Sequence, residues 1–353
     1  MNYSIFRLSV IRTVDSPLFS GMGMLRVVRC SYIQQIQPFF FSNNIKSVGF
    51  AQSIFRRCLK RALTINGNYS ITYNNRQYFP SSLSLENCLF QNCRIENEDG
   101  GAFYAASGII FNMTHIGFYN CCAKSYGAYY LIALSQESKY ICISYGSASQ
   151  CCYYIYVTNN NNPNKCSFIS AEFYSIHISL KRGSSVNYSN WNVSNNNGGV
   201  GHAYFKPPYV NANYLNLINI TSDNAIHPSS TNGGFIISVN FVKVKASTAV
   251  ILYWQTNILV KDCVFIDCDG YLAKRSSSAT QITGFSFQNC ISNREFLCDL
   301  SPNLCFVTNN VQTMALMHVG TCFNRYVFEN GKTFAMIKNH IPLFFIEILV
   351  YIQ

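Results

Sequence analysis

The chain has 353 residues, of which 12% are charged and 15% are aromatic, and 39 are asparagine. Its net charge is +11, and it contains no P-loop, dinucleotide-binding or metalloprotease fingerprint. This balance argues against an acidic or lysine-rich cytosolic enzyme and fits a polar, weakly charged β surface.

Basic residues are concentrated near the N-terminus. Residues 1–61 contain nine lysines and arginines against the single acid Asp15. This asymmetry favours an anionic partner surface such as phospholipid, a glycan or nucleic acid. A basic cap that keeps the ends of solenoids from stacking on one another would have the same composition. Because a basic cap explains the composition equally well, we expect no specific nucleic-acid binding. We expect residues 1–39 to form a basic N-terminal segment or cap.

A phenylalanine followed three residues later by a cysteine recurs along the chain, at Phe55/Cys58, Phe90/Cys93, Phe118/Cys121, Phe265/Cys268 and Phe287/Cys290. Degenerate copies fill the gap between the clear ones, with anchors at Tyr145, Phe168, Trp191, Leu217 and Phe241. From Phe118 onward the anchors advance by 22 to 27 residues. That period is typical of a solenoid unit.

Each unit contains three short apolar stretches that we predict to be strands. The anchor stretch alternates apolar and polar residues, which is the period of two expected of a strand. A second stretch often opens with glycine, as at Gly100 and Gly127, and a third precedes the next anchor, as at Ile109 and Lys139. These features predict an all-β fold, a parallel β-helix of about ten three-stranded coils over residues 40–330. A β-sandwich is the alternative, but a sandwich gives no reason for the same residue types to repeat in register.

Stacked coils would place equivalent residues above one another. We expect an inward aromatic column on one sheet, containing Phe90, Phe118, Phe265 and Phe287. Two residues after each anchor, side-chain amides and a carboxylate would form a ladder at a bend, made of Asn92, Asn120, Asp267 and Asn289. The following cysteines would also stack, as Cys93 on Cys121 and Cys268 on Cys290. Both disulfides and buried free thiols fit that spacing, although parallel Cβ vectors favour free thiols.

Few residues form a pattern typical of catalysis. Asp262, Asp267 and Asp269 cluster around one anchor, at a spacing that could hold a metal ion or a paired acid and base. Since Asp267 occupies the ladder position, we expect it to be structural, and we expect no catalytic residue, metal or cofactor. The six histidines are scattered through different units. The candidate binding residues are instead exposed tyrosines, whose rings suit glycan or protein contacts: Tyr126, Tyr129, Tyr130, Tyr153, Tyr154 and Tyr156.

The ends of the chain bear on its location. Six N-x-S/T sequons would be glycosylation acceptors in a secreted chain. The first apolar run is interrupted by Arg7 and Arg12, so no intact signal peptide is expected. Residues 331–353 form an apolar C-terminal tail, in which the 13-residue run from Ile341 contains Glu347 and is shorter than the roughly 20 residues of a bilayer span. We expect this run to be a truncated membrane segment, a capping strand or an artefact of a truncated reading frame.

The combination of F-x-N-C strands with following glycine-rich strands resembles the pectin-lyase-like right-handed β-helix superfamily. Its carriers are 90–93 with 100–102, 118–121 with 127–128, and 287–290. More narrowly, the chain is similar to the cysteine- and asparagine-rich surface β-helices of protozoan parasites, and loosely to chlamydial polymorphic outer-membrane passenger repeats. The resemblance covers about residues 40–330 and implies a right-handed coil and an adhesive role at a cell surface.

These patterns predict a noncatalytic extracellular or cell-surface β-helix that adheres to glycans or host proteins. Membrane association would then depend on a missing or truncated segment. One alternative is a polysaccharide lyase or hydrolase of the pectin-lyase-like superfamily, and another is a degenerate fragment without function. Three or more carboxylates, or an acid with an arginine, converging in one groove would favour the enzyme.

Overall fold

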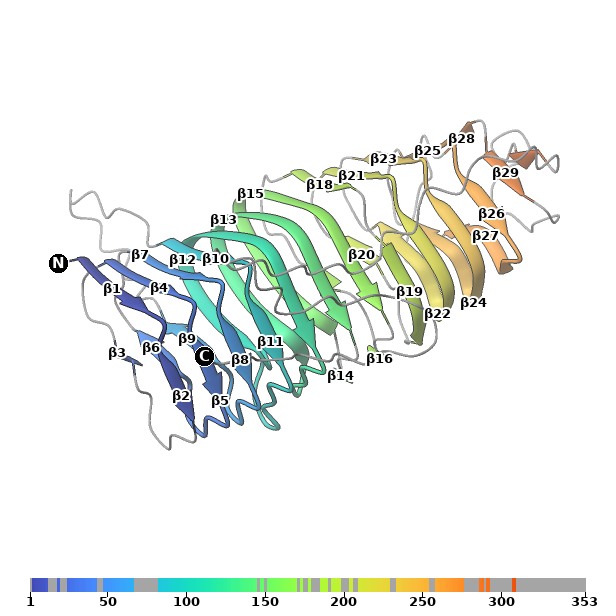
Figure 1. Cartoon of the computed structure of the whole chain (residues 1–353). Coiled ribbons are helices and arrows are strands. Elements are labelled where there is room, and N and C mark those ends of the chain that lie inside the picture. Colours follow the sequence, from blue (N-terminus) through green and yellow to red (C-terminus); the bar gives the residue numbers. More distant parts are fainter. Residues whose placement is uncertain are drawn as a thin grey trace, which may run out of the picture.

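The computed structural model of the chain describes residues 2–11, 18–19, 24–42, 47–66, 82–144, 147–148, 151–169, 172–173, 177–178, 185–189, 192–197, 203–205, 209–228, 233–253, 258–275, 286–288, 290–292 and 307–308. Every element of this part is a strand. The strands pair in parallel and form a β-solenoid of the right-handed type, which confirms the predicted fold class. Figure 1 shows the coils following one another in chain order along a rod.

The first of three ladders of paired strands runs through β1, β4, β7, β10, β12, β13, β15, β18, β21, β23, β25 and β28 in that order. Twelve described segments therefore stack in it, where about ten coils were expected. The ladder already includes residues of the segment 1–39. Its separate strands are β1 (Asn2–Phe6), β4 (Met24–Val28), β7 (Ser47–Ala51), β10 (Ser82–Glu86), β18 (Ser185–Ser189), β21 (Tyr209–Asn213), β23 (Gly234–Ile237), β25 (Ile258–Lys261) and β28 (Ser286–Gln288).

The second ladder contains the anchors. Its separate strands are β2 (Ser9–Ile11), β5 (Ser31–Ile33), β8 (Ile54–Arg56), β11 (Leu89–Gln91), β19 (Asn192–Asn197), β26 (Val264–Ile266), β29 (Cys290–Ser292) and β30 (Val307–Thr308). The third ladder contains β3 (Leu18–Phe19), β6 (Phe40–Ser42), β9 (Leu63–Asn66), β17 (His177–Ile178), β20 (Ala203–Phe205) and β27 (Asp269–Arg275). The short strands β14 (Ser147–Ala148) and β16 (Glu172–Phe173) pair with each other, and β16 pairs with β19.

Five long strands pass from one ladder into another around the coil: β12 (Phe103–Tyr119), β13 (Tyr126–Ser144), β15 (Cys151–Ile169), β22 (Asn216–Pro228) and β24 (Asn240–Tyr253). In β12, Phe103 pairs with Leu63 in the third ladder, Ile110 with Ser82 in the first and Phe118 with Phe90 in the second. The three apolar stretches predicted for each unit are therefore the three sides of a coil.

The same two-residue bend joins the first ladder to the second and also follows the second ladder, where further residues lead into the third. The first residue of the bend has a left-handed backbone, with φ between 48° and 58°. Examples are Asn87 at the first bend and Asn92 at the second. Asparagine tolerates this conformation better than most residues. The predicted amide ladder is confirmed between two coils, where the Asn120 Nδ2 donates to the Asn92 Oδ1 at 2.8 Å. Asp267 occupies the same position with φ of 51°, as expected, whereas Asn289 lies outside the described residues.

The second residue of these bends points inward and is buried, except that Leu8 in the first coil is half-buried. At the first bend these residues are Cys30, Ser53, Cys88, Ile116, Leu215, Val239 and Cys263, and at the second they are Gln35, Cys58, Cys93, Cys121, Ile220, Val244 and Cys268. The nine cysteines whose side chains are described are free thiols. Six of them donate weak hydrogen bonds to carbonyls of the preceding coil, such as Cys121 Sγ to Phe90 O at 3.5 Å. A small apolar side chain with a weak donor suits a corner where backbone carbonyls face the core.

The aromatic column of the second ladder fills the core. Phe90 stacks on Phe55 at 4.8 Å and on Phe118 at 5.2 Å between ring centroids, and Phe241 stacks on Phe265 at 4.7 Å. All five rings are at most 1% exposed.

The column is interrupted where the sequence anchors were degenerate. Phe118 pairs with Ile143, two residues before the expected anchor Tyr145, and Phe168 pairs with Val193, two residues after Trp191. Tyr145 and Trp191 themselves lie outside the described residues.

The placement of Phe287 in this column was wrong. Phe287 lies in β28 and pairs with Val260 in the first ladder, while Ser292 pairs with Phe265 in the second. Cys290 accordingly follows the first bend, where its thiol bonds to Val260 O at 3.6 Å, and it stacks with Cys263 rather than with Cys268. The cause is physical. Both bends use a left-handed residue followed by an inward side chain, and cysteine occupies that inward position at either bend, so the letters F-x-N-C fit either corner.

The apolar tail 331–353 lies outside the described residues. Among the residues that are described, no apolar helix of membrane-spanning length occurs.

Candidate functional site

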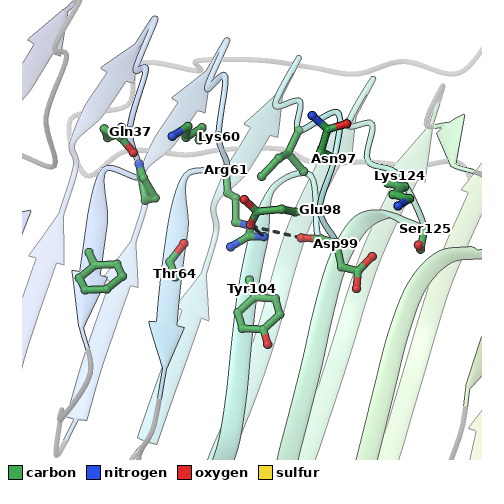
Figure 2. Close-up of a pocket in the computed structure, with 13 residues that line it drawn as sticks. Gln37, Lys60, Arg61, Thr64, Asn97, Glu98, Asp99, Tyr104, Lys124 and Ser125 are labelled. Carbon is green, nitrogen blue, oxygen red and sulfur yellow. Dashed lines mark hydrogen bonds and ion pairs between the residues drawn. The ribbon is translucent and has the colours of Figure 1, made fainter.

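A polar groove of about 730 Å³ opens where the second bend leads into the third ladder. Four successive coils contribute to it, because the turns between β5 and β6, β8 and β9, β11 and β12, and the turn that precedes β13, lie side by side along the rod. Figure 2 shows the groove. Its lining residues are Gln37, Pro38, Phe41, Lys60, Arg61, Thr64, Ile95, Asn97, Glu98, Asp99, Tyr104, Lys124 and Ser125.

The turn that carries the groove's acids, residues 94–102, is held to its neighbours by backbone hydrogen bonds. Ile95 N donates to Cys122 O at 3.0 Å, and Lys124 N donates to Glu98 O at 3.1 Å. Gly101 allows the close approach, because a Cβ there would lie 2.3 Å from the Gly127 carbonyl oxygen. The glycine motifs that begin the third-ladder strands therefore fix the position of Glu98 and Asp99.

Arg61 lies at the centre of the groove and is only 7% exposed. Its guanidinium forms an ion pair with the Glu98 carboxylate, and its Nε donates to the Asp99 carbonyl oxygen at 3.1 Å. The guanidinium carbon also lies 4.8 Å from the centroid of the Tyr104 ring. Burial lowers the pKa of Arg61, and the neighbouring Glu98 carboxylate opposes that shift. Three partners thus hold one cation in place, with φ of 98° at its backbone.

Thr64 provides a second unusual feature of the groove. Its side chain lines the groove and the residue is 5% exposed, yet the hydroxyl has no hydrogen-bond partner among the described residues. A buried polar group left unsatisfied costs about 1–3 kcal/mol. A water molecule or a hydroxylated ligand in the groove would recover this free energy.

One lysine lies on each side of the Arg61–Glu98 pair along the rod (Figure 2). Lys60 and Lys124 are exposed, as are Asn97 and Glu98. The charges that line the groove therefore sum to three positive (Lys60, Arg61, Lys124) and two negative (Glu98, Asp99). The groove is nearly balanced in charge, although the chain as a whole is basic.

A column of outward side chains, mostly aromatic, borders the groove. On the third ladder it contains, in order of pairing, Phe41, Thr64, Tyr104 and Tyr130. Tyr104 and Tyr130 stack at 5.0 Å with an interplanar angle of 4°. Tyr126 lies beside Tyr130, with a centroid distance of 5.4 Å.

The six tyrosines predicted for binding divide into three groups. Tyr126 and Tyr130 are half-buried and belong to this outward surface. Tyr129 was wrongly expected to be exposed: it is 2% exposed and stacks on Phe103 at 4.8 Å, because adjacent strand residues point to opposite faces. For Tyr153, Tyr154 and Tyr156 only the backbone is described, paired with Tyr129, Tyr130 and Ile132.

The aspartate cluster does not assemble into a site. Asp262 and Asp267 are the left-handed residues of two different bends, and Asp269 begins β27, where it pairs with Lys245. Within the described residues, no group of three or more His, Cys, Asp or Glu side chains could hold a metal ion.

Few sequence features indicated the groove. Arg61 was one of nine basic residues near the N-terminus, and Glu98 and Asp99 belonged to an unassigned turn. The only available signal was the length of that turn, since nine residues separate Cys93 from Phe103 but only four separate Cys58 from Leu63. A longer turn on one coil forms a wall beside its shorter neighbours.

No protein-family model, curated protein or solved structure matches the chain.

Proposed function

We propose that the chain is a noncatalytic binding protein that adheres to glycans or proteins on another surface. The observation that supports this proposal is the groove around Arg61, whose side chains come from four stacked coils. Backbone hydrogen bonds to the neighbouring coil hold the turn that carries Glu98 and Asp99, and polar groups in fixed positions lower the entropy cost of binding. The mixture of amides, hydroxyls, lysines and acids suits recognition of a polar ligand.

The proposal extends to family and location. The repeated F-x-N-C and glycine motifs support a place among pectin-lyase-like β-helices, in the manner of the cysteine- and asparagine-rich surface proteins of protozoa. A surface or extracellular location would suit an adhesin.

Binding of the purified chain to an oligosaccharide array and to a panel of cell-surface proteins tests the proposal. We expect at least one saturable ligand, recovered unchanged after incubation. If neither panel yields a ligand, the proposed function is wrong.

A second candidate function is a polysaccharide lyase or hydrolase, because an arginine and two acids meet in the same groove. Glu98 and Asp99 could serve as general acids or bases there. Against this, the Arg61 guanidinium is already neutralised by Glu98. Release of reducing or unsaturated sugar ends from uronate polymers, lost in Glu98→Gln, would favour the enzyme over the adhesin.

A further inference from the structure

We propose that the groove around Arg61 binds a neutral oligosaccharide whose hydroxyl groups bond to Thr64 and the surrounding polar side chains. This inference rests on the proposed binding function and names the class of ligand and the place where it binds. It follows from four features: charge, hydrogen-bonding capacity, apolar surface and extent.

The charge of the groove disfavours a polyanion. Of its three cations, Arg61 is already paired with Glu98, and Asp99 adds a second negative charge in the lining. A sulfated glycan or nucleic acid would bring its charges close to both carboxylates, which would repel it. An uncharged ligand meets no such penalty.

The hydrogen-bonding groups of the groove match hydroxyls. Gln37 and Asn97 each offer a donor and an acceptor, Glu98 and Asp99 accept, and the Thr64 hydroxyl lacks a partner among the described residues. A sugar hydroxyl both donates and accepts, so it can satisfy groups of either kind. Pairing the buried Thr64 hydroxyl would also remove the cost of leaving it unsatisfied.

The apolar surface lies next to these groups. Phe41 and Tyr104 pair with Thr64 from either side on the third ladder, and both rings are half-buried. Sugar rings have apolar C–H surfaces beside their hydroxyls, so a hydroxyl flanked by two aromatic rings suits them.

The extent of the groove suits a short chain of sugars. Its four coils are separated by three strand spacings of about 4.8 Å, so the lining spans about 15 Å along the rod. The volume of about 730 Å³ falls within the range of about 300–1,000 Å³ that is common for small-ligand sites.

The test compares Thr64→Val with a matched control, Thr114→Val. Valine has the same branched shape as threonine and carries a methyl group in place of the hydroxyl. Thr114 lies on the first ladder in β12, is half-buried and does not line the groove. Both variants should keep the native circular dichroism spectrum, and Thr64→Val should keep or raise the urea midpoint, because it removes a buried hydroxyl that has no partner among the described residues.

Each protein is applied to an array with separate neutral, sialylated or uronate-containing, and sulfated oligosaccharides. We expect binding to neutral members, at least tenfold weaker in Thr64→Val and unchanged in Thr114→Val. Neutral binding that Thr64→Val leaves intact would place the ligand elsewhere and overturn the inference, while the binding function stands. Exclusive binding to charged glycans, or to a protein and no glycan, would overturn it in the same way. A chain that binds nothing on either panel fails the proposed function itself.

Discussion

Phe118→Ala tests the central feature of the fold, the aromatic column. Phe118 is 1% exposed, and its ring centroid lies 5.2 Å from that of Phe90, 5.3 Å from Tyr129 and 6.0 Å from Phe103. Truncating a buried phenylalanine to alanine costs about 3–5 kcal/mol, through lost burial and the cavity that remains. We expect the upper half of this range, because strands paired on both sides prevent β12 from collapsing into the cavity.

The measurement is equilibrium unfolding in urea, followed by far-ultraviolet circular dichroism in reducing buffer. Phe235→Ala is the control, because Phe235 is 37% exposed on β23, and its truncation should cost less than about 1 kcal/mol. A loss below about 1 kcal/mol in Phe118→Ala, or equal losses in the two variants, would mean that the column does not support the coils as described.

Three further outcomes follow from single positions. Burial lowers the pKa of His115, so as the pH falls below about 6.5 the unfolded chain takes up a proton before the native protein does, and stability drops. Asparagine suits the left-handed bend at this position, so His115→Asn should reduce the change in urea midpoint between pH 7.5 and pH 5. Burial raises the pKa of Cys88 to about 12, so iodoacetamide at pH 8 should leave Cys88 unmodified in the native protein and label it in urea. Half-buried Cys122 should react in the native protein, and peptide mass spectrometry would measure both modifications. Asp267→Asn should preserve both the urea midpoint and ligand binding, because asparagine fills the same bend position in other coils; a loss of binding would give the carboxylate a functional role.

The coil could be predicted from the sequence because its causes are local and repeated. Alternation of apolar residues gives the strands, and the recurrence of Phe90 and Phe118 at equal register gives the column. Three sides per coil followed from three apolar stretches per unit. Each of these features depends on a few neighbouring residues, so each left a readable pattern.

The register of individual residues was harder to predict, because different positions in a coil use the same letters. Tyr129 and Tyr130 are adjacent tyrosines, yet one is in the core and the other faces outward. Phe287 has the sequence context of Phe90 but belongs to another ladder. Only the pairing of whole strands, which depends on coils 22 or more residues away, decides between such alternatives.

The groove depends on a longer-range effect still. The groove lies beside one turn that is longer than the equivalent turns of the neighbouring coils. This longer turn consists of residues 94–102. Its backbone hydrogen bonds to the next coil hold it in place, so it forms a fixed wall of the groove. Arg61 then acquires its burial, its ion pair and its contact with Tyr104 from residues 37 or more positions away. The regular part of the sequence thus builds the rod, and the departure from regularity builds the site.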